Sequence, residues 1–140
     1  MIGMADVPAT SPGPADEPIE KQLISALRVE LEEYGALLRG YEAQHHALLE
    51  RRVDLAEQAA AEIETQRQKA RACRKRREAL ARTVAEAAGC TEETSLHELV
   101  PFFPPMVRPM IEALTDEVNR LINQTKRRAR QNEALLARIS

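Results

Sequence analysis

Apolar side chains recur along this chain in alternating steps of three and four residues, which places them on one face of an α-helix. One such stripe runs through residues 24–59, and after one irregular step it continues through residues 63–87 with smaller side chains. Another stripe occupies residues 111–139, apolar at both ends and polar in its middle. No alternation of period two competes with these stripes, so the pattern predicts an all-α protein with long amphipathic helices.

The prolines sharpen the bounds of these helices. They fall in two groups, at residues 8–18 and residues 101–109, and none of the 82 residues between Pro18 and Pro101 is a proline. A proline inside a helix removes a hydrogen bond and clashes with the preceding turn, at a cost of about 3 kcal/mol. We therefore predict three helices, at about 19–52, 54–88 and 108–138.

The remaining segments are assigned from their composition. Residues 1–15 are rich in Pro, Ala, Gly, Thr and Ser and are expected to form a flexible tail. Residues 101–109 are rich in Pro and Phe and are expected to form a loop. Because 140 residues is the usual size of a single domain, residues 16–140 are expected to form one helical domain.

The first two helices are expected to form an antiparallel hairpin. A continuous helix of about 70 residues could not bury its own stripe, so the chain must dimerise or fold back on itself. Residues 16–64 hold twelve acidic and five basic residues, whereas residues 65–90 hold eight basic and two acidic ones. Folding back brings this basic stretch beside the acidic side chains of Glu30, Glu32 and Glu33. The predicted fold is thus an elongated, coiled-coil-like antiparallel hairpin with a third amphipathic helix at the carboxy terminus.

Local signals predict how the hairpin turns and ends. The turn is expected at residues 51–53, with Asp54 as the N-cap of the second helix and Glu57 closing an acidic capping box. Gly89 fits the left-handed position that follows a helix end. A short helical turn is expected over residues 95–100.

Charge and chemistry narrow the classes of function. The net charge of -2 and the 30% of charged residues fit a soluble protein and exclude wholesale phosphate binding by net charge. The two cysteines cannot form a disulfide framework, and no cysteine or histidine spacing is typical of zinc. No Gly-rich phosphate loop, HExxH or nucleophile elbow occurs, so we predict no enzyme activity, no cofactor and no metal site. His45 and His46 point about 100° apart on one helix, and His45 is interpreted as a polar seam residue.

No targeting or membrane signal is found in the sequence. Residues 1–18 have no basic residue and no apolar run of the length that a signal peptide needs. Nowhere do 18 uncharged apolar residues follow one another, so no membrane insertion is expected. We predict a cytoplasmic protein.

Several surfaces leave two interpretations open. The basic stretch 67–82 could bind nucleic acid or an acidic partner, but no aromatic residue interleaves it for base stacking, and we favour its neutralisation by the first helix. Phe102 and Phe103 could form an exposed docking segment or a loop pinned onto the core. The third helix could complete a three-helix bundle or stay partly free to recruit another protein.

Short motifs recur at fixed places in the predicted helices. The first helix carries the stretch EAQHHALLE at residues 42–50, followed by a turn at Asp54. The second helix carries an Arg-x-x-Leu motif at residues 77–80 and ends at Gly89, and the last helix carries the motif NEALL at residues 132–136. With these motifs, the layout of residues 20–140 resembles the FlgN family of flagellar export chaperones.

This resemblance implies a non-catalytic chaperone, monomeric or homodimeric, that holds hook-filament junction proteins before their export by the flagellar type III apparatus. The last helix would capture the amphipathic carboxy-terminal segment of the client and prevent its premature assembly, with Asn132 as a polar register mark. The client-binding residues that the resemblance implies are Leu114, Val118, Leu121, Ile122, Asn132, Leu135, Leu136 and Ile139.

Two alternatives belong to other classes of function. The first is a structural coiled coil that self-associates through its long stripe, against which the polar seam residues Arg52, Gln66 and Arg77 argue. The second is a small helical regulator that binds nucleic acid through residues 67–82.

Overall fold

The computed structural model describes residues 17–139. Its three long helices are α2 (Ile19–Leu49), α3 (Val53–Ala87) and α5 (Arg108–Ile139). The segment between α3 and α5 holds the short helix α4 (Leu96–Leu99) and two 3-10 turns, η3 (Val100–Phe102) and η4 (Pro105–Val107). The described residues contain no strand, which confirms the predicted fold class. The predicted flexible tail lies outside the described residues.

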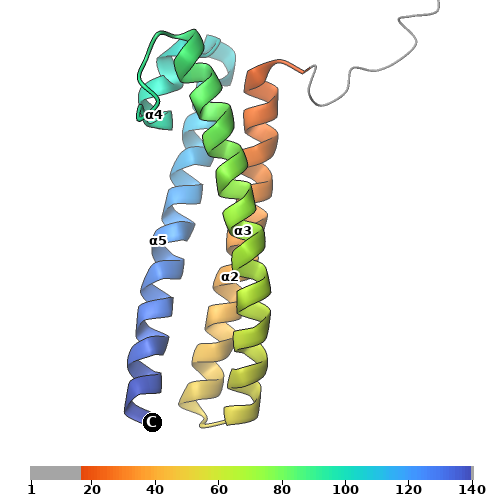
Figure 1. Cartoon of the computed structure of the whole chain (residues 1–140), viewed down its shortest axis with the longest axis vertical. Helices are drawn as coiled ribbons and strands as arrows, with labels where there is room; N and C mark the ends of the chain where they lie inside the picture. The colour runs from red at the N-terminus through yellow and green to blue at the C-terminus, as the bar shows by residue number, and fades with distance from the viewer. Residues whose placement is uncertain (1–16, 140) are drawn as a thin grey trace, which may run out of the picture.

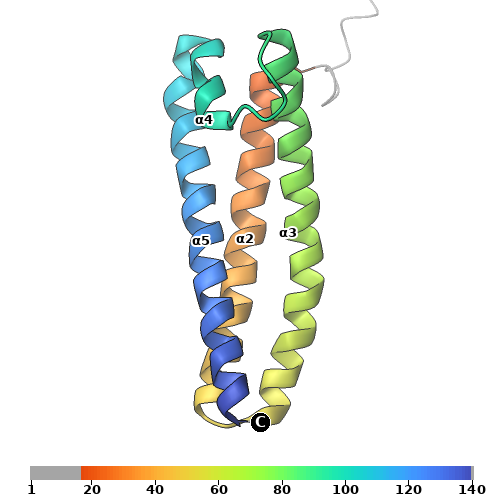
Figure 2. The ribbon, with the colours of Figure 1, turned by 60° about the vertical axis from the view of Figure 1, so that its left-hand side comes forward.

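The helix α2 is the central element of the fold. It packs against both α3 and α5, whereas α3 and α5 scarcely touch each other. Figures 1 and 2 show α3 running antiparallel to α2, and α5 running parallel to α2. The α2–α3 turn and the carboxy-terminal end of α5 therefore meet at one end of the molecule, and α4 lies at the other. At 1.5 Å per residue, each long helix spans roughly 50 Å.

The predicted cap of the second helix is wrong. Asp54 lies inside the first turn of α3, and Arg52 occupies the N-cap position without a side-chain cap hydrogen bond. The reason is Arg51, whose φ of 58° is left-handed. With Arg51 in that conformation, the Arg52 amide donates to the Ala47 carbonyl at 2.9 Å and closes α2 in a Schellman motif. The chain then enters α3 at once at Val53, two residues earlier than an Asp54 cap would allow.

The left-handed Gly89 and the short helical turn predicted over residues 95–100 both agree with the structure. Gly89 has a φ of 74°, and the Cys90 amide donates to the Ala85 carbonyl at 2.8 Å, so α3 ends in the same motif as α2. A capping box does occur, at the start of α4: the Ser95 hydroxyl accepts from the Glu98 amide while the Glu98 carboxylate accepts from Ser95.

A buried ion pair joins α2 to α3. The carboxylate of Glu30 is fully buried and accepts two hydrogen bonds from Arg77, at 2.9 Å from Nε and 3.0 Å from Nη2. This fork is the expected attraction between the acidic first helix and the basic second helix. Glu33 instead accepts hydrogen bonds from the Gln66 amide, and Glu32 is exposed.

The apolar stripes form the core around this pair. Small side chains line α3 where it meets α2, and a Cβ placed on Gly40 would lie 3.1 Å from Ile63, so the two helices approach closely there. Larger side chains dominate where α5 and the α4–η3 segment pack. The buried apolar residues include Leu23, Leu27, Ala59, Ile63, Ala70, Val84, Leu99, Ile111, Val118 and Ile122.

The segment rich in proline and phenylalanine is pinned to the bundle. Phe103 is buried, whereas Phe102 is exposed. Arg108 donates from Nε to the Phe103 carbonyl and from Nη2 to the Pro101 carbonyl, both at 2.9 Å. Phe103 therefore agrees with the interpretation of this segment as a loop pinned onto the core. Phe102 agrees with the interpretation as an exposed segment.

Candidate functional site

All eight residues of the predicted client-binding face lie on α5, but most of that face packs against α2. The buried members are Val118, Ile122 and Asn132, the half-buried members are Leu114, Leu121 and Leu135, and the exposed members are Leu136 and Ile139. The third helix therefore completes a three-helix arrangement in the free chain, and its exposed apolar residues from this set lie in its last turns.

Asn132 ties α5 to α2 through a buried polar network. Its Nδ2 group donates to the Tyr41 carbonyl and to Gln44 Oε1, both at 2.9 Å. Its Oδ1 atom is 2.8 Å from Nδ1 of His45 and accepts a hydrogen bond from that nitrogen, because an amide oxygen cannot donate. A one-residue slip of α5 would break all three bonds. Asn132 thus fixes the register of α5 on the chain's own α2, and its predicted role as a register mark toward a client stays a prediction.

An apolar groove, here called the terminal groove, lies where the α2–α3 turn meets the end of α5. Its volume is about 340 Å³. Apolar surface dominates its lining, with polar groups from the turn at one edge. The lining residues are Gln44, Ala47, Leu48, Arg51, Arg52, Val53, Ala56, Glu57, Ala60, Leu136 and Ile139. This groove joins the exposed end of the predicted client-binding face to a second apolar surface that sequence reasoning missed.

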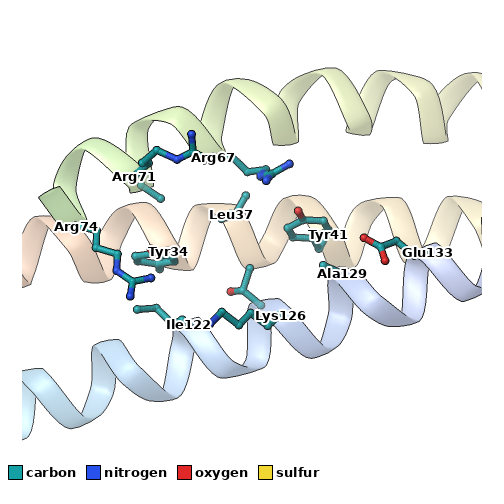
Figure 3. Close-up of a pocket in the computed structure, with 12 residues that line it drawn as sticks. Tyr34, Leu37, Tyr41, Arg67, Arg71, Arg74, Ile122, Lys126, Ala129 and Glu133 are labelled. Carbon is teal, nitrogen blue, oxygen red and sulfur yellow. The ribbon is translucent and has the colours of Figure 1, made fainter.

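A second groove, here called the central groove, lies between α3 and α5 with α2 as its floor (Figure 3). Its volume is about 420 Å³. Tyr34, Leu37 and Tyr41 contribute from α2. The α3 wall consists of Arg67, Ala70, Arg71 and Arg74, and the α5 wall consists of Ile122, Thr125, Lys126, Ala129 and Glu133. This groove exists because α3 and α5 each pack on α2 and leave a gap between them.

Basic side chains outnumber acidic ones in the lining of the central groove. Four cationic side chains and one carboxylate line it. Burial raises the pKa of the Tyr34 phenol, and the Glu30 carboxylate adds to that rise while Arg74 and Arg77 oppose it. Burial likewise raises the pKa of Tyr41, against the charge of Arg67. Both tyrosines therefore stay neutral at physiological pH and do not offset the basic walls.

Two observations concern metal and thiol chemistry among the described residues. Among residues 17–139 no group of three or more His, Cys, Asp and Glu side chains could hold a metal ion. Cys73 is half-buried, and burial, followed by the charges of Glu33 and Glu30, raises its thiol pKa. None of the described helices is both long enough and apolar enough to cross a membrane.

Comparisons with protein-family models, with curated proteins and with solved structures find no match to this chain. The likeness to the FlgN family therefore rests on the motifs in residues 42–50, 77–89 and 132–136.

Proposed function

We propose that this protein is a non-catalytic chaperone that holds an amphipathic helical segment of a client protein, in the manner of FlgN-type flagellar export chaperones. Its clients would be hook-filament junction proteins, held in the cytoplasm until the flagellar export apparatus receives them. The observation that carries the proposal is the terminal groove: the helix end that bears the FlgN-like NEALL motif borders an apolar groove open to solvent.

The terminal groove suits the apolar stripe of a client helix. Val53 and Ile139 are 60% and 46% exposed, an unusual position for large apolar side chains that border one cavity. A helix that binds in such a groove inserts side chains spaced at i, i+3 and i+4. Fully burying each leucine-sized side chain contributes about 1.5–3 kcal/mol.

The groove also divides the predicted client-binding residues into two groups. Leu136 and Ile139 border it and would touch the client directly. Val118, Ile122 and Asn132 are buried against α2, so their role in the free chain is to hold the end of α5 beside the turn. A client that used them directly would first have to displace α5.

The test is co-purification of full-length protein with a flagellar junction protein from the same host. Val53→Asp combined with Ile139→Asp places two charges in the groove and should abolish retention of the client. The matched control is Gln58→Asp combined with Ala137→Asp, because both positions are exposed on the same two helices and outside the groove lining. Equal retention by both double variants would contradict the groove as the client site. Failure of the wild-type chain to retain any junction protein would contradict the chaperone function itself.

Self-association as a structural coiled coil has less support. The seam residues that such an assembly would use are largely buried within one chain, including Leu27, Ile63 and Val84. Binding of nucleic acid through residues 67–82 would use the central groove, because Arg67, Arg71 and Arg74 form its α3 wall.

A further inference from the structure

The central groove has the form of a three-helix arrangement that lacks a fourth helix. The helices α3 and α5 flank α2 along its length and scarcely meet each other, so a groove remains between them above the buried α2 side chains Tyr34 and Leu37. The groove extends over two turns of α3 and about three turns of α5, or roughly 10–17 Å. A volume of about 420 Å³ accommodates a few large apolar side chains projecting from a helix laid along it.

The walls of the groove define the charge of the occupant. Arg67, Arg71 and Arg74 follow one another at steps of four and three, so they form one stripe of α3. Lys126 faces them from α5 (Figure 3). Arg67 and Arg74 have ion-pair partners on α3, Glu64 at 3.7 Å and Glu78 at 3.5 Å. Arg71 and Lys126 are therefore the cations on which the charge of the groove chiefly rests, with the carboxylate of Glu133 at one end. An occupant that presents carboxylates on both sides of an apolar stripe would pair with both walls.

The floor favours a protein helix over nucleic acid. Tyr34 is 8% exposed, so its ring face is not available for a base to stack on. Leu37 and Ala70 are likewise buried, and the half-buried Tyr41 and Ala129 supply the apolar surface that a leucine-like side chain can reach. The basic stripe is thus combined with a surface for burying apolar groups, the pairing that an amphipathic helix needs.

We propose that the central groove binds an acidic amphipathic helix of another protein, with its apolar stripe on Tyr41 and Ala129 and its carboxylates against Arg71 and Lys126. This site is separate from the terminal groove and does not depend on the client proposed there. The charged rim contributes an attraction that weakens with salt, and the apolar interior contributes one that does not.

The probe is a fluorescein-labelled 18-residue peptide with leucines at i, i+3, i+4 and i+7 and glutamates flanking them. Binding is followed by fluorescence anisotropy with the full-length protein. Arg71→Glu combined with Lys126→Glu reverses one charge on each wall and should weaken binding at least tenfold. The matched control, Lys75→Glu combined with Arg130→Glu, makes the same charge change on the same two helices outside the groove. It should leave the affinity within about twofold of wild type.

Further variants distinguish binding in the central groove from a general attraction between opposite charges. Ala129→Trp fills the groove without changing charge and should also weaken binding, whereas Ile139→Asp in the terminal groove should not. Circular dichroism of each variant checks that the helices are intact. Equal losses in the groove and control variants would overturn the proposal, as would equal binding of a shuffled peptide of the same composition. Tighter, groove-dependent binding of a 20-nucleotide single strand of DNA would overturn it in favour of nucleic acid.

Discussion

The two sides of α2 are built on different principles. Toward α3, the contacts are small side chains, a buried carboxylate–guanidinium fork and a glutamine that bonds Glu33. Toward α5, the contacts are branched apolar side chains and one amide network around Asn132. The first side obtains its register from charge and the second from a neutral amide. A single helix can therefore hold two partners in fixed register without offering them interchangeable surfaces.

The largest expected effect comes from breaking the charged side. Arg77→Ala removes both hydrogen bonds from Glu30, which has no exposed surface, and leaves a carboxylate buried without its partner. Loss of one partner of a buried pair costs about 3–5 kcal/mol. Urea denaturation should record a loss of this size in the free energy of unfolding.

A double replacement tests whether the loss comes from the stranded charge. Glu30→Leu combined with Arg77→Leu removes both charges and fills the space with apolar side chains, which is often neutral or stabilising for a buried pair. The double variant should recover most of the stability that Arg77→Ala loses. A double variant as unstable as the single one would mean that the pair's attraction, and not the cost of an unpaired charge, dominates.

A smaller effect is expected from breaking the amide side. Asn132→Leu keeps the branched shape of the side chain but leaves the Tyr41 carbonyl, Gln44 and His45 without their shared partner. Leaving buried polar groups unpaired costs about 1–3 kcal/mol. Thermal unfolding should report this loss, whereas Asn119→Leu on the exposed face of α5 should change stability by less than about 0.5 kcal/mol. Similar losses in both variants would contradict the role of the network.

The smallest expected effect concerns Cys73, which reports on the α3 side. Its thiol pKa is raised above the ordinary 9.0, first by burial and then by two glutamates, so folding favours the protonated thiol. The resulting contribution to stability is complete below the ordinary thiol pKa and is lost as the pH rises through the raised one. At pH 8, iodoacetamide should therefore modify Cys73 more slowly in the native chain than in urea, as mass spectrometry of the Cys73 peptide can measure. Equal rates would mean that this seam position is open.

Much of the fold could be predicted from the sequence because helix period and proline placement are local signals. The bounds of the long helices, the left-handed Gly89 and the attraction of Glu30 for the basic stretch all follow from such signals. The Asp54 cap was wrong because Arg51 takes a left-handed conformation that sequence rules reserve for glycine or asparagine. Nothing in the local pattern of Arg51 predicts that exception.

The two grooves could not be predicted, because each is lined by residues from three helices. Tyr34 and Tyr41 lie beneath the arginines of α3 in space, although no aromatic residue interleaves those arginines in sequence. The stripe of Arg67, Arg71 and Arg74 was visible, but whether it faced α2 or a gap depended on where α5 packs. For the same reason the hydrogen-bond partners of Asn132 on α2 could not be predicted.

The sequence separation of the two interfaces has a consequence for the order of folding. We expect the α2–α3 contacts to form first near the tight turn and then progressively farther from it. In that order each new contact closes only a short loop. The Asn132 bonds join residues 87–91 positions apart and can form after that hairpin exists. Contacts of such unequal range divide a protein into cooperative units that open at different free energies. We therefore expect amide protons in the last turns of α5 to exchange with deuterium through openings that leave the middle of the hairpin protected.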